Sequence, residues 1–375
     1  MRFPGTMRTR RPRCLTLMSD QRPTELTLET ARDRLAKLID RRVTGLERIG
    51  GGGNSQVYRL ETESGQRCAL KVYFRNPADQ RDRLATEYGA FSYLWANGFR
   101  GIPQALACDQ SLGWAIYQFV EGDKIPPGAA RDSDLLAAAD FLGRLRELSR
   151  NPESARARIG IASEASFAPA MIAHNVRQRL ERLQQTDGDG PPYEALRRFL
   201  ATEFIPLLQN VIPWSQAHLE EAGMAFDQEL APPQRTLSPS DFGFHNALRH
   251  PDGRIFFLDF EYFGWDDPAK MISDFLLHPA MSLGPEANRK FASAIFGHFT
   301  DWPGLSARLE SVYPLFGLKW CMIFLNEFLP DSLRRRQFAG AAGADRAAVQ
   351  MRQLDKSRQM LNRIAREYQS FPYRA

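Results

Sequence analysis

The sequence predicts an α+β fold with a small β-rich N-terminal lobe and a larger α-helical C-terminal lobe. Residues 46–119 contain short segments rich in β-branched and aromatic residues, separated by glycine or asparagine turns. Amphipathic helical patterns dominate from residue 133 onward, with one interruption by short strands and loops over residues 236–259. We therefore place the N-terminal lobe at residues 23–120 and the C-terminal lobe at residues 121–375.

The N-terminal lobe is predicted to contain strands over residues 56–62, 67–74 and 113–119. A helix over residues 77–95 interrupts them, because Leu84, Tyr88 and Phe91 recur at helical spacing and Asn97-Gly98 follows as a stop signal. Residues 1–22 show no periodicity and are predicted to form a flexible basic tail.

The C-terminal lobe is predicted to contain helices over residues 133–150, 168–185, 192–210 and 214–224, with further helices from residue 268 to the C-terminus. The longest apolar run, residues 312–330, includes Lys319, Asn326 and Glu327. A membrane span would tolerate these polar groups poorly, so the run predicts a buried helix and no membrane association.

Composition narrows the class of protein. The 375 residues are 43% hydrophobic, which is enough for a large core, and their formal net charge is +5. Residues 1–19 hold five arginines and no acid, so the remaining 44 basic and 44 acidic side chains balance, and this argues against a nucleic-acid partner. Four cysteines without metal-ligand spacing favour a reducing, cytoplasmic location. The sequence carries no signal for an oligomeric state.

A glycine-rich turn lies between two predicted strands. Without side chains, the backbone of such a turn can approach a phosphate chain closely and offer it N–H groups. A plain hairpin turn is the alternative. The candidate cofactor-binding residues of this turn are Gly51, Gly52, Gly53, Asn54 and Ser55.

The predicted strand over residues 67–74 carries Ala69 and Lys71 on one face, because side chains alternate along a strand. Glu87 falls within the apolar stripe of the following helix and should therefore face inward. An inward carboxylate needs a partner, and Lys71 would provide one while its ammonium binds phosphate oxygens. The alternative is that Lys71 reaches the surface and Glu87 lies at the edge of the stripe.

A second cluster follows in the C-terminal lobe. Asp241 precedes Asn246 by five residues, and Asp259 follows a short apolar strand. These residue types suit phosphoryl transfer, with Asp241 accepting the proton of a hydroxyl and Asn246 and Asp259 binding a metal. Oxygen ligands without paired histidines favour Mg²⁺ over zinc. Each acid taken singly could also cap a turn.

The order of these motifs resembles the aminoglycoside phosphotransferase and choline kinase family, a branch of the bilobal protein-kinase-like fold. The resemblance spans roughly residues 40–330 and rests on the pattern His-x-Asp-x-x-x-x-Asn followed by a hydrophobic strand that ends in Asp. It implies ATP and Mg²⁺ as cofactors and a small-molecule hydroxyl as acceptor. By position it implies Asp241 as catalytic base, Asn246 and Asp259 as magnesium ligands, Lys71 and Glu87 as the phosphate-binding pair, and adenine contacts from the backbone near Gln118 and Val120.

Several residues depart from this pattern or have structural interpretations. Pro239 stands where the family has histidine, which puts the geometry of the catalytic loop in question. We interpret His245 as an ordinary loop residue, Asp266 or Asp267 as a helix N-cap, and Asp274 as an acid that supports the catalytic loop. Protein kinase activity is disfavoured because no activation segment follows. A pseudokinase or nucleotide-binding regulatory module is the alternative function.

The acceptor is expected to lie against the helical lobe. Trp265, Trp320 and Phe324 could form a cage for a quaternary ammonium or belong to the core. Lys319 and Asn326, seven residues apart on one helix face, could bind a hydroxyl. Residues 331–375 hold ten basic and four acidic side chains, so a neutral or anionic acceptor is favoured if this segment borders the site.

Overall fold

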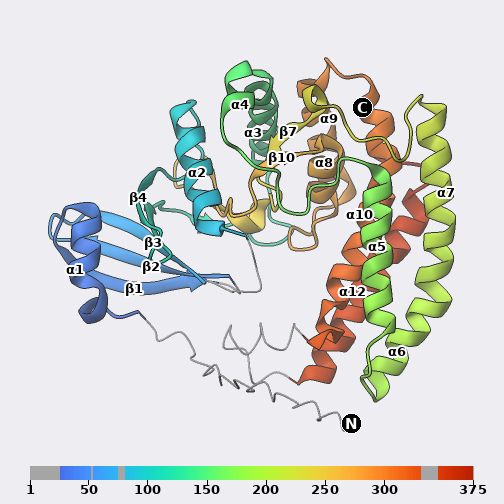
Figure 1. Ribbon diagram of the computed structural model, residues 1–375, viewed down its shortest axis with the longest axis horizontal. Helices are drawn as coiled ribbons and strands as arrows, with labels where there is room; N and C mark the ends of the chain where they lie inside the picture. The colour runs from blue at the N-terminus through green and yellow to red at the C-terminus, as the bar shows by residue number, and fades with distance from the viewer. Residues whose placement is uncertain (1–25, 52–53, 75–80, 331–344, 375) are drawn as a thin grey trace, which may run out of the picture.

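The computed structural model describes residues 26–51, 54–74, 81–330 and 345–374. The predicted tail at residues 1–22 lies outside them. A sheet region formed by residues 26–118 stands beside a larger region made mainly of helices (Figure 1). The predicted α+β order of a sheet followed by helices is confirmed.

The sheet region contains a five-stranded antiparallel sheet in the order β1-β2-β3-β5-β4. Its strands are β1 (Val43–Gly51), β2 (Ser55–Thr62), β3 (Arg67–Tyr73), β4 (Ala105–Asp109) and β5 (Trp114–Gln118). The three predicted strands match β2, β3 and β5 closely. The bounds of β1, β4 and α1 (Leu28–Ile39) were not predicted, because few of their side chains are buried and their apolar pattern is weak.

Each face of this sheet is covered by one helix. Leu70 and Ile116 pack with α1 in a small separate core, whereas Tyr73 and Tyr117 point to the opposite face and join the main core with α2 (Arg83–Ala96). The alternation of side chains along β3 therefore sends Lys71 toward α2. Helix α2 begins later than predicted, after its N-cap Asp82.

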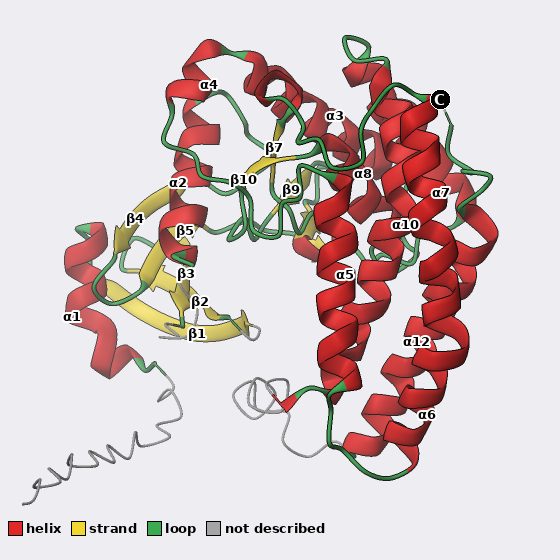
Figure 2. Cartoon of the chain, turned by 45° about the vertical axis from the view of Figure 1, so that its right-hand side comes forward, coloured by secondary structure: helices red, strands yellow, loops and turns green. Residues whose placement is uncertain are grey.

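The helical region is built around α10 (Gly304–Phe324), which is almost entirely buried, as predicted for the apolar run. Helices pack on several sides of it (Figures 1 and 2). Within the described residues, the α-helices of this region besides α10 are α3 (Asp132–Arg150), α4 (Pro152–Arg156), α5 (Pro169–Gln184), α6 (Pro191–Phe199), α7 (Ile205–Glu221), α8 (Pro268–Leu277), α9 (Pro285–Phe296) and α12 (Arg346–Glu367).

The predicted break between residues 210 and 214 is wrong. Helix α7 continues through Pro213 to Glu221, and a π-helical turn at Leu200–Phe204 joins it to α6. Buried side chains on α7, including Val211 and Leu219, hold this helix together across the proline, so tertiary packing outweighs the local preference.

The segment over residues 236–266 contains several short strands, which pair with one another and with β6. Strand β7 (Thr236–Ser238) pairs with β10 (Gly264–Asp266), and β8 (Ala247–Arg249) pairs with both β6 (Asp123–Lys124) and β9 (Ile255–Phe257). The loops that connect these strands carry Asp241, Asn246 and Asp259. Among the described residues, no helix combines the length and the apolar character that crossing a membrane requires.

Candidate active site

The predicted pair of Lys71 and Glu87 is confirmed. The Lys71 Nζ lies 2.6 Å from Glu87 Oε2, and the two side chains are only 8% and 2% exposed. The Tyr73 hydroxyl donates a second hydrogen bond of 2.6 Å to the same carboxylate oxygen. Burial alone would lower the pKa of Lys71, but the carboxylates of Glu87, Asp259 and Glu261 outweigh it and raise the pKa. These contacts fix the Lys71 side chain and favour its charged ammonium form.

Lys71 also links the sheet to the loop after β9. Its Nζ lies 2.7 Å from Asp259 Oδ1 and 3.9 Å from Glu261 Oε2. Glu261 in turn accepts a 2.7 Å hydrogen bond from Asn54, which also donates to the Tyr262 hydroxyl. This arrangement assigns Glu261, for which the sequence suggested no role, to the contact between the glycine-rich turn and the loop of Asp259.

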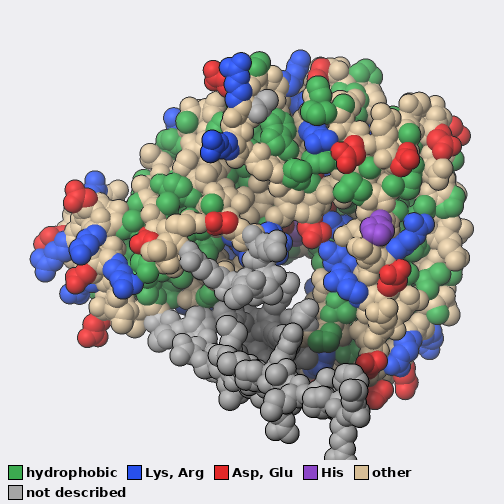
Figure 3. All heavy atoms as spheres, in the orientation of Figure 1, with side chains coloured by type: hydrophobic (Ala, Val, Ile, Leu, Met, Phe, Trp, Pro, Cys, Tyr) green, Lys and Arg blue, Asp and Glu red, His purple; other side chains and the backbone are tan. Residues whose placement is uncertain are grey.

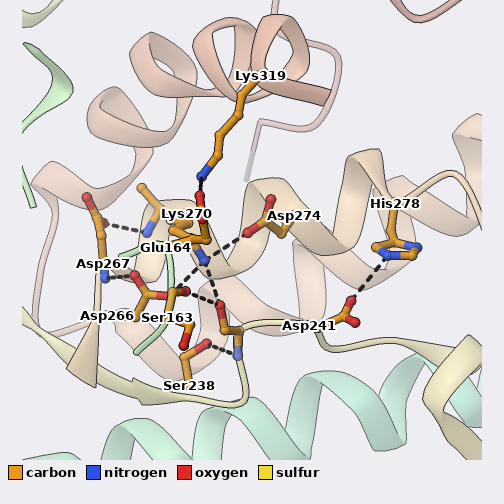
Figure 4. Close-up of polar contacts among 12 residues, drawn as sticks. Ser163, Glu164, Ser238, Asp241, Asp266, Asp267, Lys270, Asp274, His278 and Lys319 are labelled. Atoms are coloured by element: carbon orange, nitrogen blue, oxygen red, sulfur yellow. Dashed lines mark hydrogen bonds and ion pairs between the residues drawn. The ribbon is translucent and has the colours of Figure 1, made fainter. Parts of the chain in front are cut away.

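The loop that carries Asp241 has an unusual backbone at Ser240. Ser240 has a φ of 68°, a left-handed conformation that a non-glycine residue rarely adopts. Its N–H donates to the Ser238 hydroxyl, and its own hydroxyl donates to the Ser163 carbonyl (Figure 4). These bonds hold the backbone immediately before the predicted base.

Lys270 supports the same loop from α8. Its Nζ lies 3.2 Å from the Ser240 hydroxyl and within 3.0 Å of both Asp266 and Asp274 (Figure 4). The sequence analysis missed Lys270, but the expectation that Asp274 supports the catalytic loop is consistent with its position. Pro239, which replaces the histidine of the family pattern, therefore leaves a loop held by Ser238, Ser240 and Lys270.

Two histidines contact the Asp241 carboxylate, and the interpretation of His245 as an ordinary loop residue is wrong. His245 Nε2 lies 3.1 Å and His278 Nε2 3.3 Å from Asp241 Oδ1, and the two rings stack with centroids 3.9 Å apart. Burial alone would raise the pKa of Asp241, but hydrogen bonds from the two histidines hold it well below its ordinary value. His278 carried no sequence signal because it lies 37 positions from Asp241.

The donor set of the predicted metal site fits a hard divalent cation. Asn246 directs Nδ2 to the Asp241 backbone carbonyl, 3.1 Å away, which leaves its Oδ1 as the coordinating atom. The Asp259 side chain is 40% exposed and therefore accessible to an ion. An amide oxygen and a carboxylate are ligands that Mg²⁺ accepts alongside water and phosphate oxygens.

The structure describes some, but not all, of the residues predicted to contact the nucleotide in the sheet region. Gly51 has a φ of 142°, and a Cβ there would lie 2.7 Å from the Ser55 carbonyl oxygen, so glycine is required at the start of the turn. Gly52 and Gly53 lie outside the described residues. Ala69 shares the face of Lys71, as predicted. The Gln118 N–H donates to the Gln104 carbonyl, so this N–H is already engaged, whereas the structure gives no such contact for Val120.

Asp241 opens onto a pocket of about 630 Å³ between the sheet region and the helices. Lys319 and Asn326 both line it, but they do not share one α-helix as predicted, because α10 ends at Phe324 and Asn326 lies in the 3-10 helix over Leu325–Phe328. Trp320 also lines it, but Trp265 and Phe324 do not, so the three aromatic residues form no cage. Basic side chains border the hollow along α5 (Figure 3). The described part of the basic C-terminal segment contributes no lining residue.

Comparison with known proteins identifies the family of the chain. The sequence profile of the phosphotransferase enzyme family matches residues 45–307, which include Lys71, Glu87, Asp241, Asn246 and Asp259. The chain belongs to this family. It is therefore a small-molecule kinase whose acceptor is a hydroxyl group, and the resemblance noted in the sequence is confirmed.

Solved structures of this phosphotransferase's fold include a spectinomycin phosphotransferase, APH(9)-Ia, in complex with ADP and spectinomycin; it is 12% identical over 88% of this chain and 99% of its own, with a TM-score of 0.59. Choline kinase LicA from Streptococcus pneumoniae is 14% identical over 89% of this chain and 98% of its own, with a TM-score of 0.54. Amicoumacin kinase hAmiN, in complex with AMP-PNP, Ca²⁺ and Ami, is 14% identical over 89% and 93%, with a TM-score of 0.53. At these identities the similarity establishes the fold. No curated protein sequence matches the chain.

Proposed function

We propose that this phosphotransferase transfers the γ-phosphate of ATP, with Mg²⁺, to a hydroxyl group of a small metabolite. One observation carries the proposal: Asp241 lies at the lining of a pocket, with its carboxylate held between two imidazoles, beside the loop of Asp259 that contacts Lys71. In this proposal the base, the candidate metal ligand and the candidate phosphate-binding cation act together on one bound nucleotide and its acceptor.

In this proposal residues 23–120 and 121–375 act as the two lobes, and the nucleotide lies between them. Lys71 binds phosphate oxygens, and Glu87 holds its ammonium in place through the 2.6 Å contact. The turn at Gly51 and Ser55 offers backbone N–H groups to the phosphate chain, with Ala69 on the adjoining sheet face. Backbone groups near Gln118 and Val120 contact the adenine, although not through the Gln118 N–H.

Asp241 acts as the general base. It accepts the proton of the acceptor hydroxyl as that oxygen attacks the γ-phosphorus, and the bond to the leaving phosphate oxygen breaks. His245 and His278 both contact Oδ1, and Asn246 Nδ2 lies 3.4 Å from Oδ2, so we assign Oδ2, the less engaged oxygen, as the proton acceptor. Asn246 and Asp259 would hold Mg²⁺, which when bound neutralises charge on the phosphate oxygens.

Direct transfer tests the proposal. The purified protein is incubated with Mg-ATP labelled at the γ-phosphate and a library of hydroxylated metabolites, and products are separated by mass. Formation of a phosphomonoester that is absent with Asp241→Asn supports the function. No transfer to any acceptor, with nucleotide binding intact, contradicts it.

A nucleotide-binding regulatory module is the second candidate, and Pro239 is the residue that favours it. The contacts of Ser240 and Lys270 speak against it, because they order the loop around Asp241 without the family histidine. The two candidates differ in turnover: a regulatory module would bind Mg-ATP tightly and release no ADP with any acceptor.

A further inference from the structure

The pocket at Asp241 carries a surplus of positive charge. Among the described residues, six basic side chains and three acidic ones line it. The basic residues are Arg81, Arg83, Arg179, Arg182, Lys270 and Lys319, and the acidic ones are Glu164, Asp241 and Asp274. Arg83 lies 3.4 Å from Glu261 at the sheet side, and Lys270 is enclosed by two aspartates, so neither accounts for charge on the acceptor side.

The acceptor side of the pocket is formed by α5 and α10, and its cations outnumber its acids. Arg179 and Arg182 come from α5 and Lys319 comes from α10, and Glu164 is the acid that Arg179 and Lys319 contact. Glu164 Oε2 lies 3.2 Å from Arg179 and 3.1 Å from Lys319, so one carboxylate serves two cations. This wall therefore offers a net positive surface to whatever occupies the pocket.

Lys319 shows that this positive charge is incompletely compensated. Its side chain is only 8% exposed, whereas that of Glu164 is 48% exposed and partly screened by water. Burial lowers the pKa of Lys319 below its ordinary value even though Glu164 acts in the opposite direction. A second anionic group beside Lys319 would restore the balance, because a desolvated ammonium is stabilised by each carboxylate or phosphate oxygen it contacts.

The same pocket is poorly suited to a cationic acceptor. Asp274, which also lines the pocket, is already bound by Lys270 at 3.0 Å and by the Trp320 indole at 3.3 Å. Asp241 is required as the base. Trp320 and Tyr262 line the pocket but Trp265 and Phe324 do not, so the predicted cage of three aromatic residues does not compensate for the missing acids.

We infer that the acceptor is an oxyanion: a hydroxylated small molecule that also carries a carboxylate or phosphate group, bound by Lys319, Arg179 and Arg182 while its hydroxyl meets Asp241. The inference rests on the proposed function and specifies its substrate class. A carboxylate and a phosphate each present two oxygens that can accept parallel hydrogen bonds from an arginine guanidinium. Asn175 and Asn326, which also line the pocket, supply neutral hydrogen-bonding groups for the rest of the molecule.

Two series of acceptors, each with one scaffold and one position that is neutral, anionic or cationic, test the inference. Glucose, glucuronate, glucose 6-phosphate and 6-amino-6-deoxyglucose share one scaffold and differ at carbon 6; glycerol, glycerate, glycerol 3-phosphate and 3-amino-1,2-propanediol form a smaller series. Transfer from Mg-ATP is measured as kcat/KM for each. Binding is measured separately by calorimetry with the nucleotide site filled by Mg–AMP-PNP, so that the probes cannot occupy it.

Variants link any preference to the proposed wall. Lys319→Met is expected to weaken binding of the anionic probes by about tenfold, the effect of losing one charge-assisted hydrogen bond. Arg182→Gln, at an exposed position that does not threaten folding, is expected to weaken it by about threefold. Arg177→Gln is the matched control, since Arg177 is exposed on the same helix but does not line the pocket. The affinity for the neutral probes should change by less than about twofold with Arg182→Gln.

Binding and turnover separate the two claims. Tighter binding of glucuronate or glucose 6-phosphate than of glucose, reduced by Lys319→Met and by Arg182→Gln and kept with Arg177→Gln, supports the inference; which of the two anions binds more tightly identifies the oxyanion. Anionic probes that bind no tighter than neutral or aminated ones overturn it, whatever the turnover. Turnover of glucose or 6-amino-6-deoxyglucose in that case leaves the proposed function standing, and binding without transfer to any acceptor contradicts the function alone.

Discussion

The ammonium group of Lys71 lies 2.7 Å from the carboxylate of Asp259, which is 188 residues away in sequence. This contact joins the central strand of the sheet region to the loop that follows β9. Glu87 contacts the same ammonium group at 2.6 Å, so one cation joins a carboxylate of the sheet region to a carboxylate of the loop after β9. Lys71 and Glu87 are both buried, so each depends on the other to balance its charge.

Replacing Lys71 with Met leaves the Glu87 carboxylate buried without its partner. Breaking a buried ion pair in this way is expected to cost about 3–5 kcal/mol in the free energy of unfolding. The double variant Lys71→Met/Glu87→Gln should recover part of that loss, because no uncompensated charge remains. Urea unfolding measures both, with Lys290→Met at an exposed ion pair as control. Equal stability of the single and double variants would contradict the argument.

Asp241→Asn is expected to lower kcat by about 10²–10⁴-fold, because the amide cannot accept the hydroxyl proton. Nucleotide affinity should change little, since Asp241 contacts neither Lys71 nor Glu87 in the structure. Single-turnover transfer and calorimetric ATP titration provide the two measurements. Asp252→Asn, in an exposed hairpin, is the control. A variant that keeps wild-type kcat would remove Asp241 from the catalytic role.

The acid limb of the pH profile is expected to depend on His278. Hydrogen bonds from His245 and His278 hold the pKa of Asp241 well below its ordinary value, so its carboxylate stays ionised, and contributes stability, until pH falls through that lowered value. His278→Phe preserves a ring against His245 but removes one donor, so the pKa of Asp241 should rise. The loss of kcat/KM on acidification should then begin at higher pH. An unchanged acid limb in this variant would show that His278 does not tune Asp241.

Lys270→Met is expected to reduce both stability and turnover. It leaves Asp266 fully buried without its ammonium partner, an effect of about 3–5 kcal/mol, and it removes the contact with the Ser240 hydroxyl. Asp274→Asn is milder, because the amide oxygen can still accept from Trp320. Thermal unfolding and kcat should fall together in Lys270→Met. Normal kcat in a folded Lys270→Met variant would mean that the loop around Asp241 does not need Lys270.

Removal of divalent cations by EDTA should abolish transfer, and Mg²⁺ should restore it. Asp259→Asn is expected to raise the Mg²⁺ concentration required for half-maximal activity by at least about tenfold, since a neutral amide binds a hard cation more weakly than a carboxylate. Activity titrations against free Mg²⁺ measure the effect. Transfer that persists in EDTA would contradict the proposed roles of Asn246 and Asp259.

Local rules were sufficient for the first half of the site. Strand alternation predicted that Lys71 would share a face with Ala69, and the apolar stripe of the next helix predicted that Glu87 would meet it, because both elements impose fixed side-chain directions. Neighbouring loop residues likewise identified Asp241 and Asn246. Packing decided the case of α7, which continues through Pro213 although the local signal predicted a break.

The sequence by itself determined the sheet-then-helix fold, the Lys71–Glu87 pair and the order of the candidate catalytic residues. Only the tertiary structure decided which groups surround Asp241. Lys270 reaches the loop of Asp241 from α8, and His278 reaches it from the position after that helix. Arg179 and Lys319 contact Glu164 from two different helices. These contacts join residues far apart in the chain, and no strand or helix period relates their positions. They form because burying the faces of α5, α8 and α10 in one core brings their polar edges to the same pocket.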